Sequence, residues 1–505
     1  APTTAPVAPA VNTQPQTAPA GQLVIGAIEE PASLSPLIDL PHHFPEHVLQ
    51  TLLFDSLTQY MPDGSVSPKL AQSWDVSSDN RSYTFHLNPR AMFQDGTPIT
   101  ADDVKFTFDA ALDPNTNSSN EGLATVDRTE VIDPQTLKVT LKDIDPTFLA
   151  QGGARGIVPM HVLQGQDLKT SDFSKKPIGS GPYKLVSYTP GQSVVMEAVP
   201  DFYRGPAHIK TIVYKVLTDQ NVVLTQLRSG ELNYGLITPR DLSAVSGVSS
   251  LKVVEEKDPR FYDIHYNYQR PYFQDIQVRQ ALLQAVDRQA LVDKVLQGHG
   301  AVMDSNVSPV SWAFNPEVPK FPFDPPSAKA LLDAAGWTPG SDGVRGKDGQ
   351  KLSFTVMIYN YDATLQQALL VVQQNLKDVG VDMQIRPQEE GVMNSRRANG
   401  EFDAYSRIWN PVYDPDQCSL LVTGNKYGGY SNPQADAACK TEKTSLDQSV
   451  RKPALFQIQQ VLAQDVARLW LYSEDQLNAL SSNVQGVQPH PVNFFWNMKD
   501  WTLGS

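Results

Sequence analysis

Apolar and polar positions alternate over several short segments of the chain, a pattern typical of half-buried strands. Tyr83, Phe85 and Leu87 are separated by polar residues. The same two-residue period occurs in residues 137–141 and 381–385. We therefore expect a strand in each of these segments.

Longer segments carry apolar residues at helical spacing and end at a glycine, where helices commonly stop. Thr100 followed by Asp103 also has the form of an N-terminal capping box. Three predicted helices lie in the second half of the chain: residues 278–296 before Gly298, a helix that Asp324-Pro325 begins and Gly336 ends, and residues 365–379 before Gly380. Since a predicted strand follows the third helix, this half is expected to be an α/β lobe.

Composition and charge narrow the class of protein. The chain has 505 residues, of which 40% are hydrophobic and 19% charged, as in ordinary globular proteins. The net charge of −14 argues against nucleic acid and against anionic lipid as partners, because both need basic patches. No apolar run approaches the ~20 residues that cross a bilayer.

The N-terminal segment is rich in Pro, Ala, Thr and Gln and has almost no large apolar side chain. We interpret residues 1–22 as a disordered tether of a mature chain whose signal peptide has been cleaved. A propeptide or cloning remnant is the alternative. A tether of this kind would suit a lipoprotein with an N-terminal lipid.

Catalytic and metal-binding motifs are absent from the sequence. It has no G-x-S-x-G elbow, no H-E-x-x-H and no C-x-x-C, so neither an enzyme nor a bound cofactor is expected. Residues 343–348 have the wrong spacing for a phosphate loop and are read as a hairpin turn. His43 and His47 would share a helical face, but Pro45 fits the start of the helix, so His43 falls outside it and no metal site is expected.

Several short motifs occur in a fixed order, and together they resemble the family 5 extracellular solute-binding proteins of ABC importers, of the dipeptide, oligopeptide and nickel-binding type. The motifs are AQSW (residues 71–74), FQDGTPITADDV (93–104), IGSGPYKL (178–185), DFYRGP (201–206) and DIQVRQAL (275–282). Each motif is weak alone, but the ordered set is specific.

The resemblance implies a two-lobed α/β periplasmic-binding-protein fold of the cluster C type, with hinge strands between the lobes. Lobe one would comprise residues 23–48, 168–265 and 473–505, with a small inserted domain at 49–167. Lobe two would comprise residues 266–472. The protein would bind a peptide between the lobes by hinge closure, act as a monomer outside the cytoplasm, and deliver the peptide to membrane permease subunits.

The resemblance also suggests residues that face the ligand: Leu40, His42, His43, Tyr361, Arg407, Trp409 and Asp414. Peptide-binding relatives place an aspartate three residues after the tryptophan, where it holds the peptide's ammonium group. Here that position is Val412, and Asp414 either takes over the role or only holds the loop. Core packing remains the alternative for Tyr361 and Trp409, and a surface ion pair for Arg407.

Cys418 and Cys439 are the only cysteines. They could be buried free thiols or one disulfide. Export to an oxidising compartment favours the disulfide, as does the resemblance, because peptide-binding relatives often carry a bridge in this stretch.

Two classes of function remain open from the sequence. The first is a binding protein that hands a peptide to a permease, or in the same role an oligosaccharide, a nickel chelate or another small solute. The second is a hydrolase with an unmarked site. The missing catalytic motifs favour the first.

Overall fold

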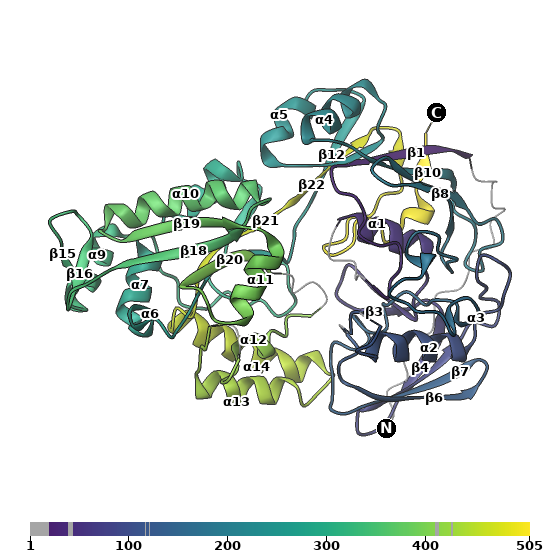
Figure 1. Cartoon of the computed structure of the whole chain (residues 1–505), viewed down its shortest axis with the longest axis horizontal. Helices are drawn as coiled ribbons and strands as arrows, with labels where there is room; N and C mark the ends of the chain where they lie inside the picture. Colours follow the sequence, from purple (N-terminus) through teal and green to yellow (C-terminus); the bar gives the residue numbers. More distant parts are fainter. Residues whose placement is uncertain are drawn as a thin grey trace. The chain divides into compact units, whose positions relative to one another are not determined.

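A computed structural model describes residues 20–38, 44–116, 118–120, 122–409, 414–425 and 428–504. The chain divides into two compact units (Figure 1). Unit 1 contains the described residues up to Glu256 together with those from Gln476 onward, and unit 2 is Lys257–Asp475. No helix in the described part of the chain is both long enough and apolar enough to cross a membrane.

Unit 1 is built on a seven-stranded sheet. Its strands, in spatial order, are β12 (Leu251–Glu256), β22 (Gln476–Ser481), β11 (Tyr234–Ile237), β1 (Ala20–Ala27), β10 (Ile209–Val216), β9 (Ser193–Ala198) and β8 (Tyr183–Thr189). β1 pairs in parallel with β10 and β11. Helix α4 (Gln220–Ser229) packs on this sheet through Val223, Leu224 and Leu227.

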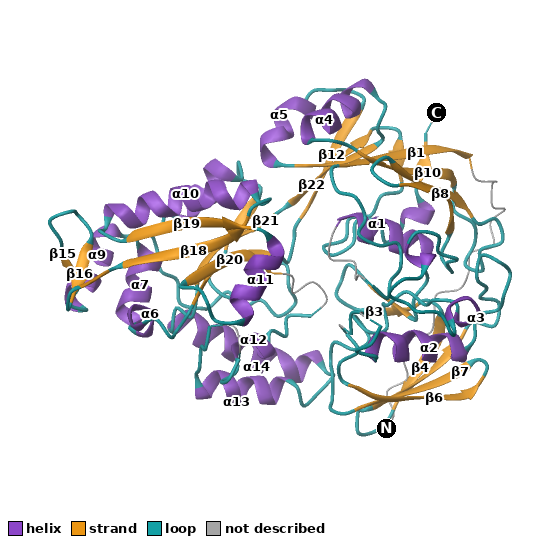
Figure 2. Ribbon diagram, in the orientation of Figure 1, coloured by secondary structure: helices purple, strands orange, loops and turns teal. Residues whose placement is uncertain are grey.

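A second sheet in unit 1 has four antiparallel strands, in the order β4 (Ala71–Val76), β5 (Ser82–Leu87), β7 (Thr136–Leu141) and β6 (Val126–Asp133). The predicted alternation is confirmed, since Tyr83, Phe85 and Leu87 are buried. Helix α2 (Ala101–Leu112) lies against β6 and β7 (Figure 2), and the predicted capping box of Thr100 and Asp103 begins it. Two-stranded pairs complete unit 1: β2 (Thr58–Tyr60) with β3 (Val66–Pro68), and β23 (Val484–Gln485) with β24 (Thr502–Leu503).

Residues of the IGSGPYKL motif pack against the end of helix α1 (Phe44–Leu53). The N–H groups of Ser180 and Gly181 both donate to the Leu53 carbonyl, at 3.0 and 2.9 Å. A Cβ atom at Gly179 would lie 1.9 Å from that same oxygen, so only glycine fits there. Gln94 of the FQDG motif accepts from the Gly179 N–H and donates to the Tyr183 carbonyl. The side chain of Gln94 therefore joins the two motifs through backbone groups of the second.

The DFYRGP motif supplies partners to a buried acid. Asp55 is fully buried, and its carboxylate contacts Lys69 at 3.1 Å, Arg204 at 3.2 Å and the Tyr203 hydroxyl. Burial raises the pKa of Asp55, but Arg204 and Lys69 outweigh it and hold that pKa below its usual value. A buried charge needs such partners, so this motif also serves the fold.

Unit 2 is a six-stranded mixed sheet covered on both faces by helices (Figure 2). Its strands, in spatial order, are β14 (Gly300–Val302), β21 (Leu469–Glu474), β13 (Phe261–Tyr266), β20 (Ala404–Trp409), β18 (Ser353–Tyr359) and β19 (Asp382–Gln388). Val356 and Ile358 point to one core, whereas Met357 and Tyr359 point to the other. The expected α/β lobe is thereby confirmed.

Helices α7 (Ile276–Gln284), α9 (Pro325–Ala334) and α10 (Ala363–Asp378) contribute to the first core. Helices α11 (Glu390–Ala398), α13 (Pro433–Glu442) and α14 (Gln448–Gln464) contribute to the second. Asp324 caps α9 as predicted. The charged residues after α9 form the small sheet of β15 (Thr338–Pro339), β16 (Arg345–Lys347) and β17 (Gln350–Lys351). The predicted turn over 343–348 is therefore wrong for residues 345–347, which are the middle strand between two turns.

Three predicted boundaries differ from the structure. The helix expected over 278–296 ends at Gln284, because Asp287 caps a new short helix, α8 (Arg288–Ala290), which runs into a π-helical turn. Residues 20–22, assigned to the tether, belong to β1 because their backbone pairs with β10. β13, assigned to lobe one, pairs with β20 and β21, so the chain crosses between units at Glu256/Lys257 and Asp475/Gln476. The boundaries of the inserted domain stay a prediction.

Candidate ligand-binding site

Most of the predicted ligand residues that the structure describes lie at one edge of the unit 2 sheet. β18 and β20 run parallel and end there with Tyr359 and Trp409. β13 begins at the same edge, because Phe261 pairs with Trp409 and Asp263 with Arg407. Functional side chains often lie at the carboxyl ends of parallel strands. Leu40, His42 and His43 lie outside the described residues, as does Val412, so their roles stay predictions.

Trp409 is only 5% exposed and belongs to the second core of unit 2. Its indole N–H donates to Asp263 Oδ1 at 2.8 Å, and Asp263 Oδ2 accepts from Arg468 at 2.9 Å. The guanidinium groups of Arg468 and Arg407 lie 4.6 and 4.9 Å from the Trp409 ring. Burial raises the pKa of Asp263, although Arg468 opposes the rise. Trp409 is thus held by a polar network within the fold, and its contact with ligand stays a prediction.

Tyr361 and Arg407 are more accessible. Tyr361 is 60% exposed, stacks on Tyr359 with ring centroids 5.3 Å apart, and donates to a Glu390 carboxylate oxygen at 3.3 Å. Arg407 is half-buried, and its Nε–H donates to the Ile408 carbonyl at 3.2 Å. Its guanidinium lies over the Trp409 ring and forms no ion pair with the described residues. Both side chains are suited to contacting a solute.

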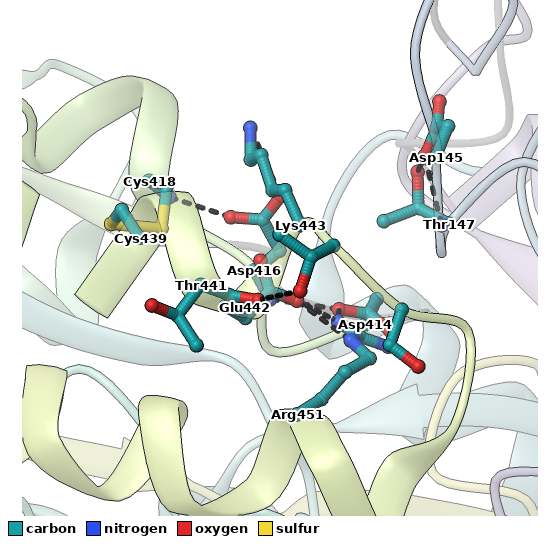
Figure 3. A network of polar contacts seen from close by, with 12 residues as sticks. Asp145, Thr147, Asp414, Asp416, Cys418, Cys439, Thr441, Glu442, Lys443 and Arg451 are labelled. Carbon is teal, nitrogen blue, oxygen red and sulfur yellow. Dashed lines mark hydrogen bonds and ion pairs between the residues drawn. A yellow bond between two sulfur atoms is a disulfide. The ribbon is translucent and has the colours of Figure 1, made fainter. Parts of the chain in front are cut away.

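Asp414 lies in a buried ion-pair network (Figure 3). Arg451 donates to both its carboxylate oxygens, at 2.8 and 2.6 Å, and donates through Nε to Glu442 at 2.7 Å. The side chains of Arg451, Asp414 and Glu442 are 3%, 8% and 0% exposed. Burial raises the pKa of Glu442 to about 7, and the neighbouring Asp416 adds to the rise. Asp414 is therefore engaged by a cation of the protein itself, and its role as an amine anchor stays a prediction.

The predicted disulfide between Cys418 and Cys439 is confirmed, and it joins α12 (Cys418–Leu421) to α13 beside this network (Figure 3). Within the described residues, Asp416, Cys418 and Glu442 are the one group with potential metal-ligand atoms near one another. The sulfur of Cys418 is bonded to Cys439, and Arg451 occupies the Glu442 carboxylate. This group does not fit a metal, because metal ligands are thiolates rather than disulfides.

The sequence patterns did not reveal a second polar group in unit 2. Tyr262, Asp362, Tyr472 and Glu474 come together from β13, the N-terminus of α10 and β21. In the sequence, Asp362 is distinguished only by preceding a predicted helix. Glu474 is distinguished only by lying near the point where the chain returns to unit 1. Nothing in their local spacing shows that residues 112 positions apart meet.

Most of the chain matches a known family of proteins. Residues 65–431 match the family described as bacterial extracellular solute-binding proteins, family 5 Middle. The match covers well over half of the chain and spans both units.

The chain belongs to this family.

Its relatives include the oligopeptide-binding protein AppA of Bacillus subtilis, with 31% identity over 96% of this chain and 92% of AppA. Protein XP55 of Streptomyces lividans is also 31% identical, over 93% of this chain and 87% of that protein. The family match and the likeness to AppA confirm the resemblance inferred from the ordered motifs.

Solved structures of the family confirm the two-lobed α/β fold. AppA of Bacillus subtilis in complex with a nonapeptide has a TM-score of 0.84 at 29% identity, covering 96% of this chain and 99% of that chain. NikZ of Campylobacter jejuni in complex with Ni(L-His) has a TM-score of 0.84 at 26% identity, covering 95% and 99%. Similar folds therefore hold chemically different solutes in these two proteins.

Proposed function

We propose that this chain is the substrate-binding component of an ABC importer that captures a peptide outside the cytoplasm and delivers it to membrane permease subunits. The supporting observation is the likeness to AppA, which extends over 96% of this chain and includes a structure with a bound nonapeptide. A protein of this role binds and releases its solute unchanged, so no turnover is expected.

The accessible side chains at the edge of the unit 2 sheet suit a peptide. Arg407 can pair with a carboxylate of the ligand, since guanidinium groups bind carboxylates through two hydrogen bonds. Tyr361 offers an exposed aromatic face and a hydroxyl group. The segment of Leu40, His42 and His43 is proposed to add contacts from unit 1.

A metal chelate is the second candidate, and one observation favours it: the NikZ complex with Ni(L-His). A metal chelate can present carboxylate groups, and Arg407 could bind one of them. An oligosaccharide is less favoured, because Trp409, the predicted stacking platform, is almost wholly buried.

Native mass spectrometry of the protein as purified tests the proposal most directly, because slowly dissociating ligands survive purification. A mass increment that resolves into peptides on denaturation supports a peptide receptor. A nickel isotope pattern supports the chelate, and hexose increments support a sugar.

A pool of defined peptides then provides a second test. A peptide that binds should raise the melting temperature, and the rise should grow with the logarithm of its concentration once that concentration exceeds the Kd. Small-angle scattering with and without a bound peptide tests the predicted closing motion, which requires a smaller radius of gyration at saturation. Release of peptide fragments on prolonged incubation would instead establish a hydrolase.

A further inference from the structure

Four side chains meet on one side of the unit 2 sheet, outside the residues proposed above. Tyr472 and Glu474 lie two positions apart on β21 and so share a face of that strand. Tyr262 on β13 pairs directly with Tyr472, and the two ring centroids are 5.1 Å apart. Opposite Glu474 on β14 stands Gly300, so no side chain covers Glu474 from that strand.

Asp362 completes the group from the start of α10. One carboxylate oxygen accepts from the Leu365 N–H at 2.9 Å as the helix cap, and the carboxylate also accepts from the Tyr262 hydroxyl. Asp362 and Glu474 are partly exposed, whereas Tyr262 and Tyr472 are 6% and 0% exposed. The two acids are therefore the members of the group that solvent can reach, and the two tyrosines are buried beneath the surface.

The charges around these two acids do not balance. Beside Glu474 lie Asp362, Arg260, Asp258 and Asp475. Arg260 donates through Nε to Asp258 Oδ2 at 2.7 Å, and Lys257 pairs with Asp475 at 2.6 Å. Among the described residues, Glu474 and Asp362 are left without an ion pair. Burial raises the pKa of Glu474 to about 8, and Asp362 adds to that rise.

The hydroxyl of Tyr472 is an independent sign of an absent partner. It is fully buried and has no hydrogen-bond partner among the described residues. Tyr472 shares a face of β21 with Glu474 and packs against Tyr262, whose hydroxyl is hydrogen-bonded to Asp362, so its ring lies among the residues that carry the two carboxylates. A buried polar atom without a partner costs free energy, so a group that supplies a donor here is stabilising.

We propose that Glu474, Asp362 and the Tyr472 hydroxyl form a subsite for an ammonium or guanidinium group of the bound solute. This inference rests on the proposed function and deepens it by naming a charged feature of the ligand. An ammonium group donates three hydrogen bonds, and the subsite offers two carboxylates and one phenolic oxygen as acceptors. Val412 stands where peptide-binding relatives are expected to carry an acid, and the carboxylate of Asp414 is paired with Arg451. The subsite therefore offers a ligand cation the carboxylates that these two residues do not.

Binding at this subsite is linked to proton release. Glu474 keeps its proton near neutral pH, and an arriving cation favours the ionised carboxylate, so the proton leaves to solvent. Below pH 8 the affinity for a cationic ligand should therefore rise with pH, by at most about tenfold per pH unit. A neutral ligand should show no such dependence.

The test uses calorimetry with the full chain and pairs of alanine pentapeptides. Each pair carries lysine or the isosteric, uncharged norleucine at one of the five positions. Wild type should prefer lysine at one position by roughly tenfold or more. N-acetylated versions of the same peptides show whether the recognised cation is the terminal ammonium group or the side chain.

Two variants remove the charges with little change in shape. Glu474→Gln and Asp362→Asn should both abolish the preference for the cation and its pH dependence, while norleucine peptides still bind. Asparagine is as good a helix cap as aspartate, so Asp362→Asn keeps α10. Glu401→Gln, at an exposed acid in the same unit, is the matched control and should behave as wild type.

Each outcome decides something. An unchanged lysine preference in Glu474→Gln overturns the subsite, although the peptide receptor stands. If no peptide binds wild type, the peptide function fails, and putrescine and arginine methyl ester then probe the subsite alone. Their binding should disappear in Glu474→Gln, and no binding to wild type overturns the inference. Stabilisation by Ca²⁺ or Mg²⁺ that Glu474→Gln removes would identify a metal site instead.

Discussion

Replacing Asp414 by asparagine separates the two roles considered for this residue. The structure places its carboxylate on Arg451 through two hydrogen bonds of 2.8 and 2.6 Å, inside a network that is almost wholly buried. Asparagine keeps the shape and one acceptor oxygen but removes the charge. If the carboxylate serves the fold, the substitution should lower the stability of unit 2. If it anchors a ligand amine, the substitution should lower peptide affinity.

The expected size of the stability loss follows from the contacts. Breaking a buried ion pair by removing one partner costs roughly 3–5 kcal/mol. Glu442 continues to accept from Arg451 Nε at 2.7 Å, so the guanidinium is not left unpaired. Asparagine also keeps one of the two hydrogen bonds. We therefore expect a loss of about 2–3 kcal/mol, at or below the lower end of the range for a broken pair.

Native-state hydrogen exchange read by mass spectrometry measures this loss in α13 and α14 directly. A local measurement is needed because two compact units need not unfold in one step. Asp447→Asn is the control, since Asp447 is an exposed cap of the same helix α14 and asparagine caps equally well. Protection within about 0.5 kcal/mol of wild type, together with at least a tenfold loss of peptide affinity, would refute the structural role and support the amine anchor.

Three further predictions concern unit 2. Cys418→Ala with Cys439→Ala should cost about 3 kcal/mol, because the bridge spans 21 residues, and denatured, unreduced wild type should titrate no free thiol. Trp409→Phe should cost about 1–3 kcal/mol by leaving Asp263 Oδ1 without its donor, whereas weaker peptide binding at unchanged stability would favour a ligand contact. Because the pKa of Glu442 is raised to about 7 in the folded protein, the free energy of unfolding of wild type should fall by up to about 3 kcal/mol as pH rises from 4.5 through about 7. Urea titrations measure this fall, and Glu442→Gln should flatten it.

The elements that could be predicted from the sequence are those set by local spacing. The alternation of Tyr83, Phe85 and Leu87 indicated β5, and the caps at Thr100 and Asp324 began helices at the expected residues. The predicted helix over 278–296 failed for an instructive reason. Its apolar residues face a single core on both sides of Asp287, so their spacing carries no sign that the backbone is interrupted there.

Contacts between distant segments could not be predicted from spacing. β13 was assigned to the wrong unit because its sequence does not specify that it pairs with β20 and β21. Ala20 joined a sheet through backbone hydrogen bonds, which composition does not record. The partner of Asp414 is Arg451, on a helix that also carries the ordinary apolar residues of a core. Each of these depends on tertiary pairing, which one sequence does not specify.

The motifs that identify the family explain why its fold was easier to infer than its ligand. Gly179 leaves room for the Leu53 carbonyl, and Arg204 binds the buried Asp55, so these motifs hold unit 1 together. Both contacts lie within unit 1, whereas Arg407, the proposed ligand contact, belongs to the unit 2 sheet. A chain can therefore keep every motif that specifies the fold while the side chains at the edge of that sheet change. Relatives that share the fold with AppA and NikZ are expected to differ in solute through those side chains.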